Sequence, residues 1–392
     1  MKLFLATTML AIAAGKEPLR GSSLRGAEKD CILEEVSLLR IPGQVLSDPL
    51  HPGEDMDGDT VFECLDSNGM TTVLDIDEEQ KSALNQMISD GSIVPGETSL
   101  DITQATSAQD RISLPHGKVN IKNKGRAPGR NLELPQPTVI GMKRVLAVKV
   151  KDGNGLQLTD SPATISDNIF GTGDHNDEVN LKSQLHDCSF GLVNVTTDYS
   201  DPAIESAMTS PGVLEVDISV DLATSSRATI RNAVTTAVNT KLGIELPGPF
   251  DYVMYLLEGC YVECGWAGYA YVNSWNSVYQ GDNYAAPGVQ VHELGHNFNL
   301  AHSGGLNGEE YTDHTCMMGN PLYTDEIGKM CFNPAKNWQL GWYGDKYVEV
   351  DPLLNSLSLH TLVGIGEFNE QQQQPVVVKI ETGTPKDYFV GF

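Results

Sequence analysis

The chain has 392 residues with 26 lysines and arginines against 52 aspartates and glutamates, which gives a formal net charge of −26. This length allows two or three domains and a substantial hydrophobic core. The strong negative charge argues against nucleic acid or an anionic membrane surface as a partner, because both would repel it.

The N-terminus predicts a secretory signal peptide over residues 1–15. Lys2 supplies a positive start, residues 3–14 form an apolar run too short to span a bilayer, and small residues precede Gly15. No later segment is apolar over the length of a membrane span. We therefore expect a secreted, soluble protein, acting outside the cell or in the cell wall as a monomer.

Residues 16–137 are polar and acidic, with only short apolar runs, and end in a basic linker over residues 117–137. The linker contains the segment Gly125–Arg130, whose glycines, proline and arginines are typical of exposed chain. Two interpretations remain open, a permanent N-terminal domain and a propeptide that is removed by cleavage in the linker. We favour the propeptide.

From residue 138 the pattern becomes that of an α/β unit, which we assign to residues 138–345. Alternating or continuous apolar runs predict strands, and apolar residues at helical spacing predict a helix that ends at Gly243. Pro287 is a favourable first residue for a later helix, in which Val291, Leu294 and Phe298 would face the core. The predicted strands cover 145–150, 214–220, 252–257 and 266–272, and the predicted helix covers 230–242.

The helix expected after Pro287 carries the most informative motif. His292 and His296 are four residues apart, so a helix places both imidazoles on one face about one turn apart, opposite the core face. His302 follows six residues later, so the chain must turn sharply before it. Asn299 lies where this turn is needed, and asparagine adopts left-handed backbone more readily than most residues.

Three neutral imidazoles with an open fourth position are typical of catalytic zinc sites, since structural sites usually have four protein ligands. Zinc held in this way lowers the pKa of a bound water and polarises a carbonyl group. Glu293 lies beside the first ligand, where it can take the proton from that water as general base and pass it to the departing amine. The motif therefore predicts zinc-dependent hydrolysis of an amide bond. The alternative is a catalytically silent, zinc-folded adhesion or matrix-binding protein, which would not need Glu293.

The segment His292-Glu293-x-x-His296-x-x-Asn299-x-x-His302 resembles the signature of the metzincin clan of metallopeptidases, with asparagine at the usual glycine. Residues 315–319, Thr-Cys-Met-Met-Gly, resemble the clan's Met-turn, in which Met318 would pack beneath the zinc ligands.

Residues 140–345 more closely resemble the gametolysin family of zinc metallopeptidases, peptidase family M11. This resemblance implies a metzincin-like α/β catalytic domain with a mixed sheet and an active-site helix. It also implies a secreted zinc endopeptidase that acts on extracellular or cell-wall glycoproteins. The strand near residues 266–273 would then form the edge of the cleft and pair with the substrate backbone. The segments that carry the resemblance are 179–189, 266–273, 292–303 and 331–342.

Seven cysteines in an exported chain predict disulfides, and the odd number leaves at least one cysteine unpaired. Some metzincins block their zinc with a propeptide cysteine, and Cys64 or Cys31 could serve, because a thiolate binds zinc well. Neither lies in the clan's familiar switch motif. A disulfide between Cys31 and Cys64 is the alternative that we favour.

Residues 346–392 contain short apolar runs that predict a small β-rich segment, at 348–350, 357–365 and 376–380. This segment is shorter than the family's C-terminus, as expected of a truncated chain or one that lacks an accessory part. Asn194-Val-Thr196 is the sole N-glycosylation sequon and marks Asn194 as the predicted site, although such triplets are often unused.

Overall fold

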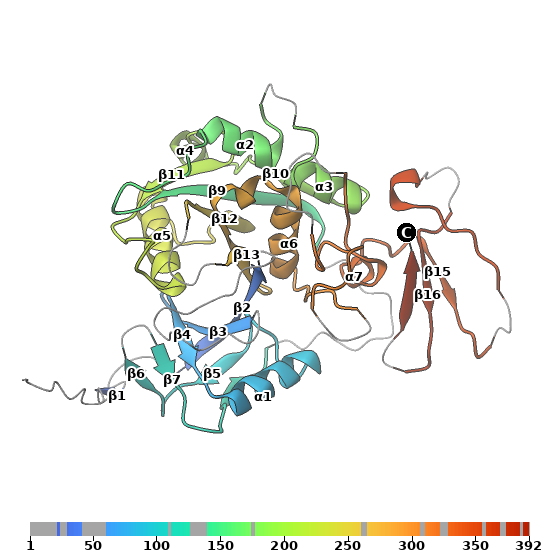
Figure 1. The fold of residues 1–392 in the computed structure, drawn as a ribbon, viewed down its shortest axis with the longest axis horizontal. Helices are drawn as coiled ribbons and strands as arrows, with labels where there is room; N and C mark the ends of the chain where they lie inside the picture. Colours follow the sequence, from blue (N-terminus) through green and yellow to red (C-terminus); the bar gives the residue numbers. More distant parts are fainter. Residues whose placement is uncertain are drawn as a thin grey trace, which may run out of the picture.

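The fold is that of a computed structural model, which describes most of the chain. The described residues are 22–23, 30–40, 60–108, 111–125, 139–173, 177–259, 265–305, 310–321, 328–354, 358–368, 374–384 and 387–391. The predicted signal peptide lies outside these residues, as does all of the basic linker beyond residue 125. Figure 1 shows three parts, a central α/β unit, an N-terminal region below it and a small C-terminal sheet at its side.

The central unit is built on a mixed sheet with the strand order β11-β9-β12-β14-β13. The first four strands run parallel, and β13 is antiparallel to β14. A short strand, β10, also pairs in parallel with the first part of β9. The bounds are β9 Gly141–Lys151, β10 Val193–Thr196, β11 Val213–Asp217, β12 Tyr252–Leu257, β13 Trp266–Tyr271 and β14 Asn276–Gln280.

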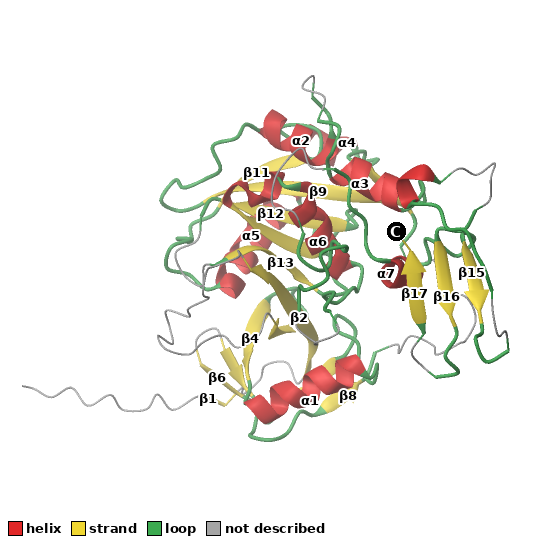
Figure 2. Ribbon diagram, turned by 45° about the vertical axis from the view of Figure 1, so that its right-hand side comes forward, coloured by secondary structure: helices red, strands yellow, loops and turns green. Residues whose placement is uncertain are grey.

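Helices cover both faces of this sheet, so its strands are buried on both sides, as parallel strands usually are (Figure 2). One face packs on α2, α3 and α6, and the other on α4 and α5. The bounds are α2 Pro162–Phe170, α3 Leu181–Cys188, α4 Pro202–Ala207, α5 Arg227–Leu242, η1 Gly281–Ala285 and α6 Pro287–Asn297.

The predicted elements of this unit are confirmed. The helix α5 begins after Ser226, whose side chain accepts from the Thr229 amide, and it ends at Gly243 in the left-handed conformation. Strand β12 coincides with its predicted range, and β9 and β13 agree to within a few residues at each end. The mixed α/β architecture predicted from the alternation of strands and helices is therefore present.

The N-terminal region folds around a hydrophobic core of its own, which its polar composition did not predict. Leu33, Phe62, Leu74, Leu84 and Leu100 are buried in this core. Its strands extend the main sheet, because β2 pairs antiparallel with β13 on one side and β3 on the other. The bounds are β1 Ser22–Ser23, β2 Asp30–Arg40, β3 Thr60–Leu65, β4 Thr71–Asp75, α1 Glu78–Ser89, β5 Ser99–Asp101, β6 Thr106–Ala108, β7 Arg111–Ser113 and β8 Ile121–Asn123.

The C-terminal part forms a separate three-stranded sheet, as the β-rich pattern predicted. The prediction of a strand over residues 357–365 is wrong. Residues 358–364 have no regular structure, and Leu359 is 96% exposed, because this run pairs with no strand among the described residues. The bounds are α7 Pro334–Gln339, β15 Tyr347–Val350, η2 Ile365–Glu367, β16 Val377–Ile380 and β17 Tyr388–Gly391.

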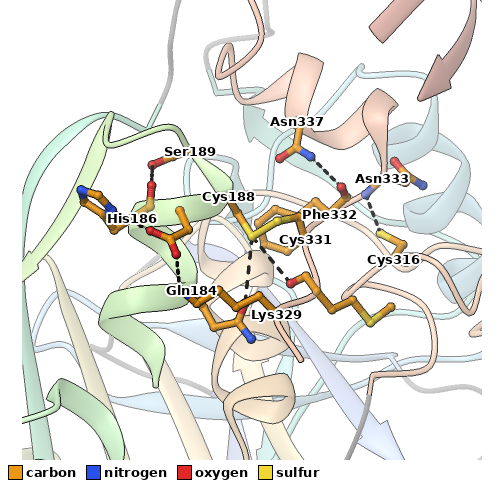
Figure 3. The surroundings of a disulfide bond; sticks show 12 residues. Gln184, His186, Cys188, Ser189, Cys316, Lys329, Cys331, Phe332, Asn333 and Asn337 are labelled. Atoms are coloured by element: carbon orange, nitrogen blue, oxygen red, sulfur yellow. Dashed lines mark hydrogen bonds and ion pairs between the residues drawn. A yellow bond between two sulfur atoms is a disulfide. The ribbon is translucent and has the colours of Figure 1, made fainter. Parts of the chain in front are cut away.

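Two disulfides are present in the described part of the chain. Cys31 is bonded to Cys64 inside the N-terminal region, and Cys188 at the end of α3 is bonded to Cys331 just before α7 (Figure 3). Cys316 is a buried free cysteine whose sulfur accepts from the Asn333 amide at 3.1 Å. None of the helices in the described ranges combines the length and apolarity needed to cross a bilayer.

Candidate active site

The helix α6 and the turn after it bring the three motif histidines together. Pro287 occupies the first turn of the helix, which ends at Asn297. Asn299 then adopts a φ of 68°, and the Leu300 amide donates to the carbonyl of Gly295 at 3.0 Å. The left-handed turn predicted at Asn299 is therefore confirmed. It reverses the chain so that His302 returns toward the helix.

The three histidines lie close enough to bind one ion. One ring nitrogen from each of His292, His296 and His302 lies within 4.8 Å of the others. The Nε2 atoms of His292 and His296 are 3.2 Å apart. Both rings are fully buried, and the His302 side chain is only 7% exposed.

The second nitrogen of each buried ring faces a backbone carbonyl. His292 Nδ1 lies 2.6 Å from the Met317 oxygen, and His296 Nδ1 lies 2.9 Å from the Leu300 oxygen. A carbonyl only accepts, so each Nδ1 carries the proton and each Nε2 presents a lone pair. Burial holds the pKa of both imidazoles well below 6.5, which keeps them in the neutral form that binds metals.

His302 has a carboxylate as its outer partner. Its Nδ1 lies 2.9 Å from Glu310 Oε2, an arrangement that fixes the ring and makes it a stronger ligand. Its Nε2 faces two hydroxyl groups, Tyr311 at 2.9 Å and Ser37 at 3.1 Å. Ser37 belongs to β2, so the N-terminal region reaches directly to the histidine cluster.

This donor set fits a zinc ion. Two Nε2 lone pairs face each other at 3.2 Å with no proton available between them, since both Nδ1 atoms are protonated. A shared cation removes the resulting repulsion. Three imidazole nitrogens are the protein ligands of one established type of catalytic zinc site. His292, His296 and His302 are thus the residues that would hold the metal.

Glu293 follows His292 in α6 and is a buried acid. Within the described part of the chain, neither carboxylate oxygen has a hydrogen-bond partner, although the side chain is fully buried. Burial raises the pKa of this carboxyl well above its ordinary value near 4.5. An orphaned buried carboxylate costs stability, and groups of this kind concentrate at functional sites.

Gly268 in β13 provides the space for this carboxylate. A Cβ atom at residue 268 would lie 2.7 Å from Glu293 Oε1 and 2.9 Å from its Cγ. Both approaches are closer than van der Waals contact allows, so any side chain at this position displaces the carboxylate.

We expect Gly268→Ala to lower kcat/KM on a peptide substrate by about 10- to 100-fold, because it displaces the carboxylate that the sequence predicts to be the general base, and small displacements of such a group are costly. The bound metal should remain, since the change does not touch the histidines. Gly366→Ala is the matched control, because a Cβ there meets nothing within 4 Å. Equal activity of the two variants would show that the position of Glu293 is unimportant.

Met318 packs against α6 at Gly295, between two of the histidines. A Cβ at Gly295, which lies between the two helix histidines, would be 2.3 Å from the Met318 sulfur. The Met318 carbonyl also accepts from the Ser303 amide at 2.7 Å. The predicted Met-turn residue therefore lies beneath α6, and glycine is required there to make room for its sulfur.

The histidine face of α6 is covered, whereas the sequence pattern suggested an outward face opposite the core. Every residue of α6 is buried. The segment with Met317 and Met318 contacts the helix on one side, and β2 lies next to β13 on the other. Strand β13 was predicted as the open edge of the cleft, but β2 of the same chain occupies that edge (Figure 1).

Several residues of the site carry no clear signal in the sequence. Ser37 lies in a polar region far from the motif, and Gly268 lies within an apolar strand. Glu310 and Tyr311 follow His302 by eight and nine residues. In the sequence, these two residues lie between His302 and the predicted Met-turn. This position is the one feature that marks them as candidates.

Cys64 and Asn194, the other two predicted site residues, do not belong to the histidine cluster. Cys64 is bonded to Cys31, so it has no free thiol for a metal, and of the two alternatives the structure has the disulfide. Asn194 is half-buried in β10, and its side-chain amide donates to the Gly191 carbonyl at 2.9 Å. Its glycosylation stays a prediction.

Comparison with protein families agrees with this geometry. The model of the gametolysin peptidase M11 family matches residues 152–376, which is more than half of the chain. The chain belongs to the gametolysin peptidase family, M11. The match begins directly after β9, covers the rest of the central unit with the histidine motif, and includes β15 of the C-terminal sheet. No curated protein matches the chain significantly.

Proposed function

We propose that this M11 family member is a secreted zinc endopeptidase with Glu293 as its general base. The observation that carries the proposal is the unpartnered, buried Glu293 carboxylate beside three convergent histidines. Zinc bound there would lower the pKa of a water and polarise the carbonyl of the bond to be cleaved. A purely structural zinc site has no use for a neighbouring orphaned acid.

In this proposal, different residues bind the metal, orient the imidazole rings and transfer the proton. His292, His296 and His302 hold the metal, and the Met317 and Leu300 carbonyls with Glu310 orient their rings. Glu293 accepts a proton from the attacking water and donates it to the departing nitrogen. Burial raises the pKa of the Glu293 carboxyl, which makes its carboxylate a stronger base toward that water.

We propose further that residues 16–137 are a propeptide that masks this site. Strand β2 pairs along the whole of β13, the edge on which a substrate strand would add. Val36 and Leu38 of β2 are buried in the core around α5, and Leu39 is buried in the core around α6. The edge is thus unavailable to a substrate while β2 is in place.

Buried polar contacts between the N-terminal region and the central unit support this proposal. Glu63 accepts from the Tyr271 hydroxyl at 2.9 Å, and the Arg231 guanidinium lies 4.8 Å from the centre of the Tyr271 ring. Arg231 also donates to the Gly69 carbonyl at 3.1 Å. These contacts join β3 and its following turn to α5 and β13 of the central unit. Burial raises the pKa of Glu63, and nearby Arg231 opposes part of this rise.

Three features support secretion and a protein substrate outside the cell. The two disulfides suit an oxidising compartment outside the cytosol. The family resemblance points to extracellular or cell-wall proteins as substrates. The net charge of −26 favours neutral or basic target surfaces over acidic ones.

The direct test is metal removal from the cleaved, active protein. We expect 1,10-phenanthroline to abolish hydrolysis of casein and stoichiometric Zn²⁺ to restore it. The metal-free protein should also melt at a lower temperature, because a ligand that binds only the folded state stabilises it. Activity that survives complete removal of the metal would refute the proposed function.

A further inference from the structure

Strand β2 lies along β13 in the way that an extended peptide would. The pairing is antiparallel, with Leu38 opposite Tyr269 and Leu39 opposite Gly268. On its other side β2 pairs with β3 up to Ser37, which lies opposite Thr60, the first described residue of β3. Within the described residues, β3 therefore does not pair with Leu38.

Tyr311 contacts β2 at Leu38. Its hydroxyl donates to the Leu38 carbonyl at 2.5 Å. The same hydroxyl lies 2.9 Å from His302 Nε2, and the two rings are 4.1 Å apart. One hydroxyl thus links a backbone carbonyl of the bound strand to the nitrogen of a proposed metal ligand.

The backbone at Tyr311 is held in a costly conformation. Its φ is 62°, a value that large side chains seldom adopt. Strain of this kind persists where the surroundings enforce it, and it is concentrated at functional sites. Here it accompanies a hydroxyl that is directed at both the strand and the cluster.

We propose that Tyr311 is a second catalytic residue, whose hydroxyl donates to the carbonyl oxygen of the peptide bond being cleaved. This inference rests on the proposed peptidase function. The Leu38 carbonyl of β2 occupies the place of that substrate carbonyl in the uncleaved chain. Leu39, buried opposite Gly268 and therefore close to Glu293, occupies the place of the residue that follows the cleaved bond.

The reaction adds one water across the amide bond. The water oxygen bonds to the carbonyl carbon, and one of its protons goes to Glu293. Negative charge then gathers on the carbonyl oxygen, where the Tyr311 hydroxyl donates a hydrogen bond that strengthens as the charge develops. The carbon–nitrogen bond breaks, and the nitrogen leaves with the proton from Glu293.

The test compares Tyr311→Phe with the parent chain after limited cleavage by trypsin to release the N-terminal region. We expect kcat on a peptide substrate to fall by about 10- to 100-fold, with KM changed by less than about threefold, because the lost bond acts in the transition state. Zinc content and melting temperature should match those of the parent. Tyr347→Phe, in the C-terminal sheet, is the matched control.

A binding measurement separates this proposal from the proposed function. Calorimetry with a phosphinic peptide, whose tetrahedral group imitates the attacked carbonyl, should show affinity falling by the same factor as kcat/KM. Unchanged affinity and kcat in Tyr311→Phe would overturn the catalytic role of Tyr311. A variant that gains activity only in the uncleaved chain would overturn it too, because Tyr311 would then only hold β2 in place. A parent chain without chelator-sensitive activity would instead refute the peptidase assignment, and the phosphinic peptide would still report on Tyr311.

Discussion

Replacement of Glu293 by glutamine should lower kcat/KM by between about 10² and 10⁴-fold while zinc remains bound at one ion per chain. This range is the usual contribution of a general base. Glutamine has the same shape, but it cannot accept the proton of the attacking water. The histidines and their carbonyl partners are untouched, so the metal site should persist. Hydrolysis of a fluorogenic peptide and metal analysis of the same sample provide the two measurements.

The substitution should not destabilise the fold, because the carboxylate that it removes is buried and has no partner. We expect a melting temperature equal to or above that of the parent. Glu215→Gln on the surface of β11 is the control for a simple loss of charge. Retention of more than about a tenth of the parent activity by Glu293→Gln would reject its role as general base.

Release of the N-terminal region should produce the second large effect. We expect the uncleaved chain to hydrolyse peptides at least about 100-fold more slowly than the chain cleaved in residues 126–138 and freed of its N-terminal part. The reason is steric, since β2 occupies the whole edge of β13. Activity should be measured before cleavage, after cleavage, and after the N-terminal fragment has been separated and added back.

A variant provides the same test without a protease. Leu39→Asp places a second carboxylate close to Glu293 in a buried position, so it should expel β2 and raise the activity of the uncleaved chain by about 10-fold or more. Asn85→Asp, on the exposed side of α1, adds the same charge to the same region without touching the edge. If β2 is shown to detach in Leu39→Asp and the activity still equals that of the uncleaved parent, the mask is located elsewhere.

The convergence of the three motif histidines was predictable, because it depends on local backbone geometry. The spacing of His292 and His296 on one helix, the turn at Asn299 and the return of His302 follow from helical periodicity and from the backbone preference of asparagine. The strands and the helix of the central unit were equally accessible, because long apolar runs and a glycine after the last helical turn are strong signals. These features depend on neighbours within a few residues.

The covering of the site was not predictable, because it depends on contacts between distant residues. Ser37 and His302 are 265 residues apart, and nothing in the sequence around Ser37 indicates a partner for an active-site helix. The apolar side chains of β2 resemble those of any strand. Residue patterns show that such a strand has two buried faces, but not which edge it will join.

The pairing of Cys31 with Cys64 has a consequence for how the two parts separate. They are the only cysteines before residue 188 in the sequence, and each is bonded to the other. Nothing is left in the first 187 residues to form a covalent crosslink to the remainder. Hydrolysis of one peptide bond after residue 125 therefore leaves the leading fragment attached by pairing and packing alone, so its departure is a reversible dissociation governed by concentration. A freshly cut sample should lose activity again when it is concentrated and regain it on dilution.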